Sequence, residues 1–551
     1  MSITDLRSRV WLLPLVIFLL LTIYQLHLPG PNYDEAVEAR PAIQILQNLP
    51  VEAHRNAVIH LFGKELPLMI VDYVGALNTL ALLLYFKIGG IGVITMRLWP
   101  ITVGAAIILL TYRLGKALFD ERIGFMAAAL LAVQPSFVFF ARQGIYVTNT
   151  TIALMLAIWL IFFKLVATGN ISYAWLIAFM AGLGLWAKFI MLWPLVATVA
   201  LLALIWPFRD KFDFTPAPGV DPHSLLTPSA WMPALLAFLA GLSPLILFNL
   251  KTEATLKHFM GTLNKSYYGV DNADYLHNLA ARWGQMRDFL QGDHFWYLGG
   301  NFVDVLAYPA FLFGIIILAA LLIWQWKHSQ SYTQTFRAIA IYAFFVLLLL
   351  QTPLTPTALW YTHLAMFSPV LALAIAASLG VLFQQVSPRM AILSAFIFIT
   401  LLGGSSLWTD VQYHRALART GGLADHSDAV YRLGNELSAR NIATPYALDW
   451  GFDAPLILVS KGRINPIEIF GYESYEHPDA GFANRIRPLL LNPNSYFLVH
   501  APDRTNFPGR REALLDAAHA LGIKLDTVAV VRERSGAPHT ELLHPVLINK
   551  E

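Results

Sequence analysis

Asp34 and Glu35 are adjacent carboxylates that follow the first long apolar run, where a chain leaving a membrane would first meet water. A carboxylate can take the proton of a hydroxyl group as that hydroxyl attacks another centre, so either residue is a candidate general base. The pair also has a structural explanation. Asn32 can cap a helix, Glu35 can close its capping box, and Asp34 suits the positive end of the helix dipole. The position of the pair in the molecule has to decide between these interpretations.

The composition is that of a membrane protein. Of the 551 residues, 57% are hydrophobic and only 13% are charged, whereas a soluble domain is about half apolar and a quarter charged. The net charge of +3 gives no indication of a nucleic-acid partner, and the lack of cysteine excludes disulfides, thiolate metal sites and cysteine nucleophiles. The sequence contains neither a Walker-type loop nor a G-x-G-x-x-G on a strand, which argues against ATP-driven transport and a nucleotide-sugar-binding Rossmann domain.

The apolar runs predict a polytopic α-helical membrane protein with about eleven transmembrane helices, since each span needs roughly 20 apolar residues. With alternate connections in the cytoplasm, the basic clusters from Arg7 to Arg389 all fall on one side, as the positive-inside rule requires. The apolar segment 66–88 would reverse this order if it spanned, so we expect an interfacial or re-entrant helix there. The predicted spans lie near residues 10–28, 95–113, 122–141, 144–166, 173–188, 190–207, 231–250, 306–326, 338–352, 363–384 and 390–408.

This topology predicts two long segments outside the cytoplasm and a C-terminal domain on the same side. The first outer loop covers residues 29–94 and the second covers 251–305. From residue 409 the hydrophobicity falls, and helix-like and strand-like pieces alternate to the end. We therefore predict a transmembrane domain over 1–408 and an extracytoplasmic α/β domain over 409–551.

Several segments occur in a characteristic order. A first helix is followed by YDEAVEARPAIQIL, by GKELPLMIVDYVGALNTL, by the stretch that begins TMRLWPITVGAAIILLTYRLGKALF, and by WLIAFMAGLGLWAKFIMLWPL. In this order the chain resembles the GT-C class of membrane glycosyltransferases, in particular the bacterial branch of dolichyl-phosphate-mannose protein mannosyltransferases and the lipid A aminoarabinose transferases. The resemblance covers residues 10 to 210 well and the later helices only in general layout.

The resemblance implies an enzyme that transfers a hexosyl or pentosyl group from a polyprenyl-phosphate carrier to an acceptor outside the cytoplasm. Asp34 matches the position of the family's base, and Glu35 matches its frequent acidic neighbour. One base and a phosphate leaving group imply a single displacement with inversion. The acceptor would be a protein, a lipid or a glycan. The enzyme would be a multi-pass protein of the plasma membrane, with its active site and C-terminal domain outside the cytoplasm.

Four basic residues are candidates to bind the phosphate of the donor, because fixed cations stabilise the charge that develops on a leaving group. Arg142 and Lys188 match positions where the family often has an arginine and a lysine, and Arg97 matches a commonly basic position. Lys64 matches imperfectly, because two residues separate it from Pro67. The acidic residue that often follows the family's arginine is missing here. Snorkelling or anchoring at helix ends is the structural alternative for the helical positions.

The sequence identifies no definite cofactor. Some of the histidines on the outer side, with Glu65 or Asp293, could bind a divalent metal, as in part of the resembling family, but no pair shows a ligand spacing such as H-E-x-x-H. The aromatic cluster His294–Phe302 can stack on a sugar or form part of an interfacial belt. In the C-terminal domain, Asp449 and Asp453 form the one patch worth testing, and caps at strand ends explain it equally well.

Two functions of other classes stay open. A transporter or flippase of lipid-linked sugars should show inverted repeats and polar groups at mid-membrane. The sequence shows no such repeat, and its polar residues gather at the outer helix ends. A non-catalytic scaffold would tolerate the loss of Asp34, whereas the enzyme would not.

Overall fold

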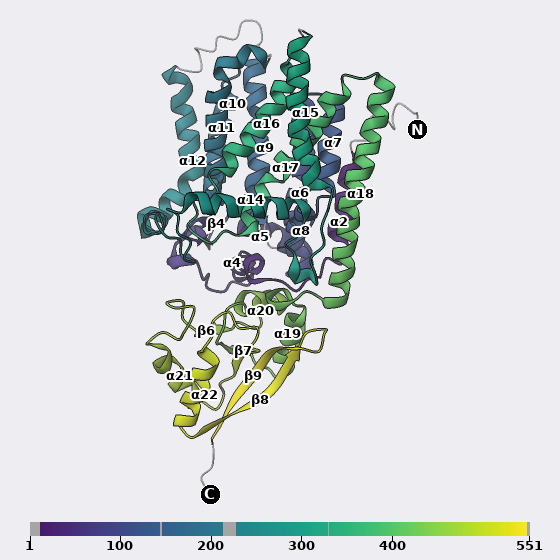
Figure 1. Ribbon diagram of the computed structural model, residues 1–551. Helices are drawn as coiled ribbons and strands as arrows, with labels where there is room; N and C mark the ends of the chain where they lie inside the picture. Colours follow the sequence, from purple (N-terminus) through teal and green to yellow (C-terminus); the bar gives the residue numbers. More distant parts are fainter. Residues whose placement is uncertain (1–11, 144–145, 213–226, 329, 548–551) are drawn as a thin grey trace.

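The computed structural model describes residues 12–143, 146–212, 227–328 and 330–547. In Figure 1 the long helices run side by side through the upper half of the molecule, and a mixed α/β domain lies below them. Short helices and hairpins fill the level between the two. The architecture is therefore a polytopic helical membrane protein with a C-terminal α/β domain.

Seven helical segments of the described chain are long and apolar enough to cross a membrane, or eight if one bent pair is a single span. The bent pair is α7 (Glu121–Ala132) with α8 (Pro135–Arg142), and its halves meet at 63°. The long segments contain α6 (Val93–Leu118), α9 (Tyr146–Thr168), α11 (Leu192–Ile205) with turns η3 (Phe189–Met191) and η4 (Trp206–Lys211), α12 (Pro228–Thr252), α15 (Ala307–Lys327), α17 (Ser368–Phe383) with turn η7 (Tyr361–Phe367), and α18 (Pro388–Thr420).

Each of the eleven predicted spans overlaps helical structure, but the span predicted at 122–141 is the bent pair α7 and α8, and three others are single helices shorter than a span needs. They are α2 (Leu13–Ile23), α10 (Ser172–Ala187) and α16 (Thr333–Leu349). The start of the first predicted run lies outside the described residues. The segment 66–88, predicted to be interfacial or re-entrant, ends in α5 (Leu77–Gly89), which is too short to cross a bilayer.

The two long connecting segments have structure of their own. Residues 29–94 form α3 (Tyr33–Ala36), α4 (Ala39–Leu46), η2 (His54–Asn56), the hairpin β1 (Val58–Leu61) and β2 (Lys64–Pro67), the pair β3 (Met69–Val71) and β4 (Val74–Gly75), and then α5. Residues 251–305 contain α13 (Ala254–Gly261), α14 (Tyr275–Gln291) and η6 (Trp296–Leu298). Both segments lie at the end of the helix bundle that faces the C-terminal domain (Figure 1).

The C-terminal domain is built on a five-stranded sheet with strand order β6-β5-β7-β9-β8. Strand β5 pairs in parallel with β6 and β7, and the remaining pairs are antiparallel. Its elements are η8 (Ala424–His426), α19 (Ala429–Ala439), β5 (Tyr446–Ala447), α20 (Asp453–Val459), β6 (Ile467–Glu468), α21 (Phe482–Leu490), β7 (Phe497–His500), α22 (Arg510–Ala520), β8 (Ile523–Arg532) and β9 (Pro538–Leu547).

Helix α18 does not end at residue 408, where the sequence predicts the domain boundary. It continues to Thr420 and stops at Gly421, whose φ of 73° suits glycine. The fall in hydrophobicity at residue 409 therefore marks where this helix leaves the apolar layer. The polar end of α18 carries the chain directly into the C-terminal domain.

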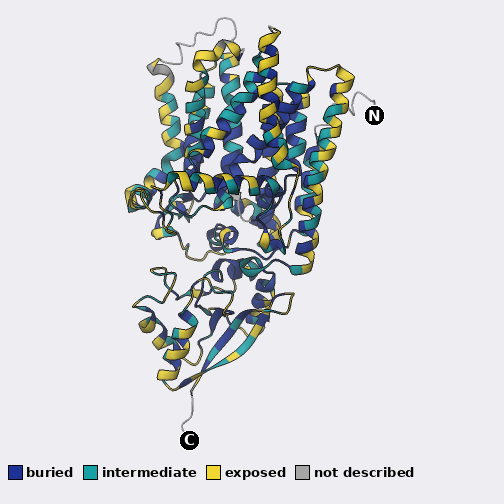
Figure 2. Ribbon diagram, viewed as in Figure 1, coloured by how far each residue is buried: buried dark blue, intermediate teal, exposed yellow. Residues whose placement is uncertain are grey.

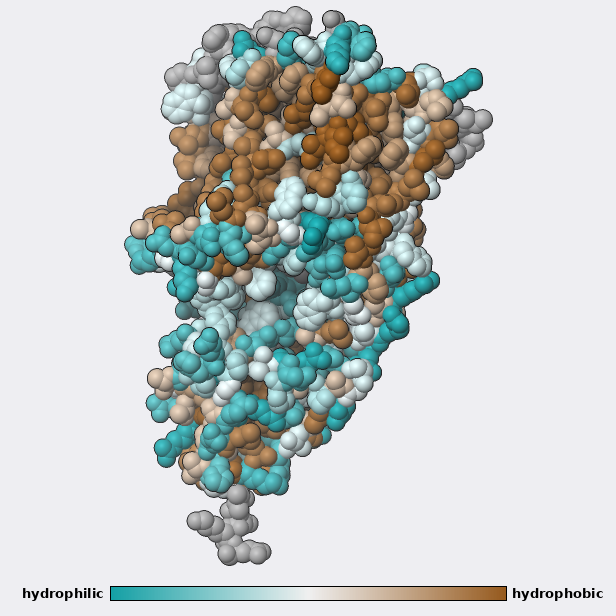
Figure 3. Space-filling view, in the orientation of Figure 1, coloured by the Kyte–Doolittle hydropathy of each residue, from teal (hydrophilic) through white to brown (hydrophobic). Residues whose placement is uncertain are grey.

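Burial separates the centre of the bundle from its rim. Helix α17 and its preceding turn are 94% buried, and Figure 2 shows the buried residues concentrated in the middle of the bundle and around α4. The outer helices instead expose large apolar side chains, for example Val199, Leu236 and Ile316. Figure 3 shows this surface as a continuous hydrophobic band. Such a band suits contact with lipid, because a soluble surface rarely exposes apolar patches of this size.

Candidate functional site

Helix α3 carries the two carboxylates, and its cap uses only one of them. The Asn32 side chain accepts a hydrogen bond from the Asp34 backbone N–H at 2.8 Å, and Glu35 Oε1 accepts one from the Asn32 N–H at 3.0 Å. This is the capping box that the sequence suggested. Glu35 therefore closes the cap, whereas the carboxylate of Asp34 takes no part in it.

Glu35 also forms a buried ion pair with Arg97 of α6, and both residues are only 1% exposed. Arg97 Nε donates to Glu35 Oε2 at 3.0 Å, and Arg97 Nη1 donates to the carbonyls of Leu26 and Pro29, each at 2.9 Å. The irregular turn between α2 and α3 has carbonyls that no helix satisfies. Arg97 supplies their donors and thereby fixes the turn that leads to Asp34.

Arg142 holds the same turn from a second helix. Its Nη2 donates to the carbonyls of Tyr24 and Gln25, both at 2.8 Å, and its Nη1 lies 3.2 Å from His414 Nδ1. The side chain is fully buried at the end of α8. Of the four candidate cations, the two arginines are thus engaged by protein groups and fix the backbone ahead of Asp34.

The Asp34 carboxylate is the free group of this region. Within the described parts of the chain it accepts no hydrogen bond and forms no ion pair. It is exposed on α3, the short helix that precedes α4. Figure 3 shows a hollow between the helix bundle and the C-terminal domain, at the level where Figure 1 places α4. The surrounding protein keeps bulk water away, and this desolvation raises the pKa of the carboxyl group; the charge of Lys188 lowers that pKa, and the charge of Asp425 raises it.

Lys188 lies beside Asp34 because of an unusual backbone contact. The residue interrupts the helical path between α10 and η3 and forms a β-bridge with Val74 of β4. This bridge also places Tyr73 next to the lysine, since the Phe189 N–H donates to the Tyr73 carbonyl at 3.0 Å. The Lys188 ammonium group donates to Thr148 Oγ1 at 3.1 Å. Its charge faces Asp34 across the hollow.

An apolar groove begins at Tyr73 and Lys188 and has a volume of about 320 Å³. It runs past Phe189 and Trp193, and between α13 and the segment 351–357. Several of its lining residues are exposed on the hydrophobic band of the bundle, namely Leu192, Val196, Leu263 and Leu354. The groove therefore connects a lipid-facing surface with a polar end at Lys188.

Lys64 is placed differently from the other candidates. It is exposed on β2, and its ammonium group donates to the Asn48 side chain. No hydrogen bond or ion pair in the described chain joins it to Asp34, Arg97, Arg142 or Lys188. The structure thus brings Asp34 and Lys188 together and leaves Lys64 on a separate hairpin. Glu35, Arg97 and Arg142 fix the turn before Asp34, and the bridge to Val74 positions Lys188.

The described residues contain no group of three or more His, Asp or Glu side chains that could hold a metal ion. Glu65 lies 3.6 Å from His60 on the exposed hairpin. His294 contacts Ser136 Oγ at 2.8 Å and stacks on Tyr361, so it belongs to the packing of α8.

The C-terminal domain packs directly on the segment that carries Asp34. Trp450 lies against Tyr33, with ring centroids 4.6 Å apart, and the Tyr431 hydroxyl donates to the His27 carbonyl at 2.7 Å. Helix α20 contacts both α3 and α4, and its Asp453 pairs with Arg40 at 2.9 Å. Asp453 is therefore an interface residue, and the domain forms one wall of the hollow.

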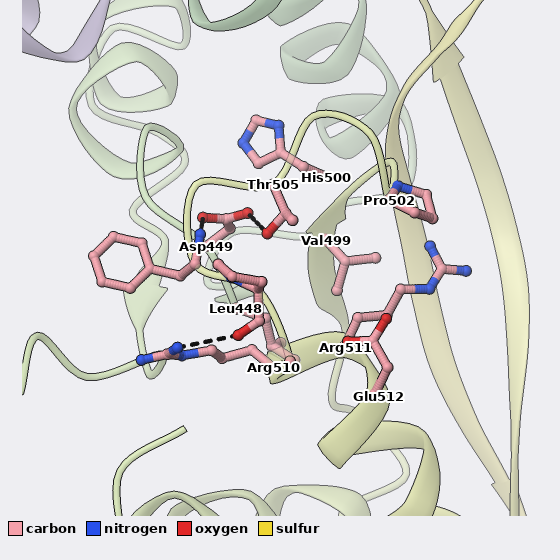
Figure 4. Close-up of a pocket in the computed structure, with 12 residues that line it drawn as sticks. Leu448, Asp449, Val499, His500, Pro502, Thr505, Arg510, Arg511 and Glu512 are labelled. Carbon is pink, nitrogen blue, oxygen red and sulfur yellow. Dashed lines mark hydrogen bonds between the residues drawn. The ribbon is translucent and has the colours of Figure 1, made fainter. Parts of the chain in front are cut away.

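A cavity of about 270 Å³ lies within the C-terminal domain, at the ends of β5 and β7 (Figure 4). Asp449 lines it, but its carboxylate accepts hydrogen bonds from the Thr505 hydroxyl and from the N–H groups of Asn506 and Phe507. Arg510 is likewise bonded to backbone carbonyls, including that of Pro508. These bonds account for the Asp449 carboxylate, and they agree with the structural interpretation of that residue.

Sequence reasoning missed several residues of the site. Asp425, Tyr73 and Tyr268 all lie close enough to Asp34 to interact electrostatically with it. Asp425 and Tyr268 come from segments far along the chain, and no local motif marks them. Tyr73 lies within the quoted segment GKELPLMIVDYVGALNTL, which was noted only for its place in the order of segments.

No protein-family model and none of the curated proteins matches this sequence. Solved structures do match. The crystal structure of ArnT from Cupriavidus metallidurans bound to undecaprenyl phosphate has a TM-score of 0.53 at 11% identity, with 98% of each chain covered. Its apo state gives a TM-score of 0.54 at 10% identity, with the same coverage.

The chain has an ArnT-like fold. This agrees with the resemblance to GT-C glycosyltransferases that the ordered segments suggested. The archaeal oligosaccharyltransferase AglB from Archaeoglobus fulgidus, in complex with an inhibitory peptide and a dolichol-phosphate, matches 98% of this chain and 74% of its own, at 13% identity and a TM-score of 0.49. At these identities the likeness concerns the fold.

Proposed function

We propose that the protein is a membrane glycosyltransferase that moves a sugar from a polyprenyl-phosphate carrier to an acceptor outside the cytoplasm. One observation carries the proposal: a free carboxylate, Asp34, faces the polar end of an apolar groove that opens on the lipid-facing surface. A lipid-linked donor needs both features, because its tail stays in the membrane while its reacting carbon must meet a base at the surface. The ArnT-like fold supports the same class of reaction.

The groove suits the lipid tail, and Lys188 suits the phosphate. The ArnT structure with the same fold carries undecaprenyl phosphate, which is a donor carrier of this chemical class. A phosphate beside Lys188 would place the attached sugar in the hollow and within reach of Asp34. The ammonium group would offset the charge that collects on the phosphate as the sugar leaves.

The reaction is a single displacement. An acceptor hydroxyl forms a new bond to the anomeric carbon while the bond between that carbon and the phosphate oxygen breaks. Asp34 takes the hydroxyl proton, and the electron pair of the broken bond stays on the polyprenyl phosphate. Attack from the side opposite the phosphate inverts the anomeric centre. The bonds and protons of this reaction balance without a protein nucleophile or a cofactor.

Glu35, Arg97 and Arg142 are positioning residues in this proposal. Their charged groups are directed at one another or at backbone carbonyls of the turn before Asp34. Ordering of the base in this way lowers the entropic cost of reaching the reactive geometry. The orientation outside the cytoplasm follows from the distribution of the basic residues.

The test is sugar transfer from a radiolabelled mixture of polyprenyl-phosphate hexoses and pentoses, with membranes as the acceptor source. Asp34→Asn should reduce transfer by roughly 10² to 10⁴-fold, the usual contribution of a general base. Asp526→Asn is the control, because Asp526 lies on β8 of the C-terminal domain, where its half-exposed carboxylate pairs with Lys524 at 2.7 Å. Equal transfer by wild type and Asp34→Asn, at matched protein levels, would refute the role of this carboxylate.

A further inference from the structure

Large aromatic side chains contact one another in a series that includes Tyr268, whose hydroxyl feels the charge of Asp34. Trp360 and Tyr268 have ring centroids 5.9 Å apart, Tyr268 and Tyr475 are 5.7 Å apart, and Tyr475 and Phe507 are 4.9 Å apart. Tyr267 joins them at 5.2 Å from Tyr268. We call these five residues the aromatic row. Each ring contacts the next, so the row forms a continuous surface.

Three distant parts of the chain build the aromatic row. Tyr267 and Tyr268 belong to the segment 251–305, Trp360 precedes η7, and the other two residues belong to the C-terminal domain. The first two parts are tied together by the backbone, because the Tyr267 N–H donates to the Pro356 carbonyl at 3.0 Å. The C-terminal domain therefore completes a surface that the helix bundle begins.

The row lies near Asp34 at Tyr268, and its Phe507 end is linked to Asp34 indirectly through Asp425. Burial raises the pKa of the Tyr268 hydroxyl, its contact with Tyr475 lowers that pKa, and the nearby charge of Asp34 raises it. At the other end, the residue before Phe507 is Asn506, whose amide donates to Asp425 at 3.0 Å. Asp425 in turn interacts with Asp34. The row thus faces the same carboxylate as the groove does.

The same two loops separate the groove from the row. Leu263 and Pro356 line the apolar groove, whereas Tyr267 and Trp360, a few residues along, belong to the row. Asp34 therefore lies between two surfaces of different character. One surface is aliphatic and lipid-facing, and the other is aromatic with phenol hydroxyls. Such a division suits a two-substrate reaction, with one surface for each substrate.

Exposure distinguishes three residues of the row from core packing and from an interfacial belt, whereas Phe507, at 3% exposed, belongs to the packing of the C-terminal domain. Tyr267, Tyr268 and Trp360 are each about half exposed, at 48%, 49% and 51%. Belt residues anchor a helix end singly in the headgroup layer, whereas these rings stack on a domain outside the bundle. Figure 3 shows pale residues of intermediate hydropathy, neither strongly polar nor strongly apolar, around the hollow. The exposed faces are thus directed at the hollow and available to a ligand.

We propose that the aromatic row binds the acceptor and that the acceptor is a saccharide, either a free glycan or the sugar head of a glycolipid. A sugar ring has an apolar C–H face and a rim of hydroxyl groups. Aromatic faces with adjacent phenol hydroxyls match both, since such side chains offer apolar contact and a polar edge together. An acyl chain would leave the hydroxyls unused. An extended peptide would need a free strand edge, and the row offers side-chain faces only.

This inference rests on the proposed function, and its experiment is independent of the donor. The full-length protein in lipid nanodiscs is titrated with soluble di- to hexasaccharides built from hexose, hexosamine and pentose units, and binding is followed by saturation-transfer NMR. The double variant Tyr268→Ala with Trp360→Ala should weaken binding by at least about tenfold, because stacked aromatic anchors dominate such contacts. Trp326→Ala is the control, since Trp326 lies at the C-terminal end of α15, outside the aromatic row, and is 72% exposed.

Two further variants separate the explanations. Tyr268→Phe with Trp360→Phe keeps the aromatic faces but removes the Tyr268 hydroxyl, so it should bind more tightly than the alanine variant and more weakly than wild type, which excludes misfolding as the cause of the loss. Asp34→Asn should bind saccharide like wild type although it no longer transfers sugar. Binding by the alanine variant equal to wild type, the absence of any binding saccharide in the panel, or displacement by tripeptides or plain lipid vesicles would overturn the inference. The role of Asp34 would be unaffected by these results.

Discussion

Replacement of Glu35 by glutamine should loosen the segment that carries Asp34 without changing the Asp34 side chain itself. Glu35 accepts hydrogen bonds from the Asn32 N–H and from two nitrogens of Arg97, and both partners of the ion pair are 1% exposed. The variant keeps the size of the side chain but leaves the guanidinium group buried without its counter-charge. Breaking a buried pair in this way costs about 3–5 kcal/mol.

The lower figure applies here, because Arg97 keeps its bonds to the carbonyls of Leu26 and Pro29. A loss of about 3 kcal/mol in the free energy of local opening corresponds to amide hydrogen exchange on the order of 100-fold faster. The measurement is exchange by mass spectrometry over residues 26–36 of the purified protein. Sugar transfer should fall as well, since the base is no longer held.

Asp34→Asn is the matched control, because its carboxylate accepts no hydrogen bond from the described chain. We expect its exchange over residues 26–36 to stay close to wild type although transfer is lost. Wild-type exchange in Glu35→Gln would refute the positioning role of the ion pair. Faster exchange in Asp34→Asn, equal to that of the Glu35 variant, would show that Asp34 is itself structural.

Three other perturbations should separate the parts of the site. In Gly75→Ala the new Cβ would lie 2.2 Å from the Trp186 carbonyl oxygen, so β4 should move away from Lys188. Turnover should then fall about tenfold or more. The transfer assay measures this fall, with protein stability measured in parallel. Lys188→Met should raise the donor KM about tenfold or more with a smaller change for the acceptor, as shown by titrating each substrate. The rate of transfer should fall as the pH decreases through the raised pKa of Asp34, because the base must be ionised. In Asp425→Asn this fall should move to lower pH, since the charge of Asp425 raises that pKa. An unshifted pH–rate profile would count against the interaction between Asp425 and Asp34.

The helical part of the fold could be predicted because a bilayer imposes one length on every span. Each predicted run coincides with a helix, even where the helix is as short as α2. The end of α18 could not be predicted in this way. Its last turns are polar on the outside and buried against η6 and the following loop, for example at Tyr413 and Leu417, so hydropathy changes where the backbone does not.

The site could be predicted only where local chemistry marks it. The position of Asp34 after the first apolar run was sufficient to identify it as a candidate. The family resemblance made Arg97 and Arg142 phosphate ligands, whereas the structure directs them at carbonyls of residues 24–30. The unsatisfied carbonyls of an irregular turn leave no trace in the side-chain sequence. Asp425 was missed because only the folded chain brings it near Asp34.

A general base has to be ordered and unbonded at once, because each protein hydrogen bond to its carboxylate competes with the substrate. The structure meets both needs by fixing the backbone around Asp34 and leaving its side chain alone. Two buried arginines hold the preceding turn, and the cap holds the first residues of α3. The C-terminal domain holds it from the other side, so closely that a Cβ on Gly30 would lie 2.1 Å from the Ser427 carbonyl oxygen. The domain therefore helps to hold the carboxylate that we propose as the base, and it also supplies two of the five residues of the surface that we assign to the acceptor.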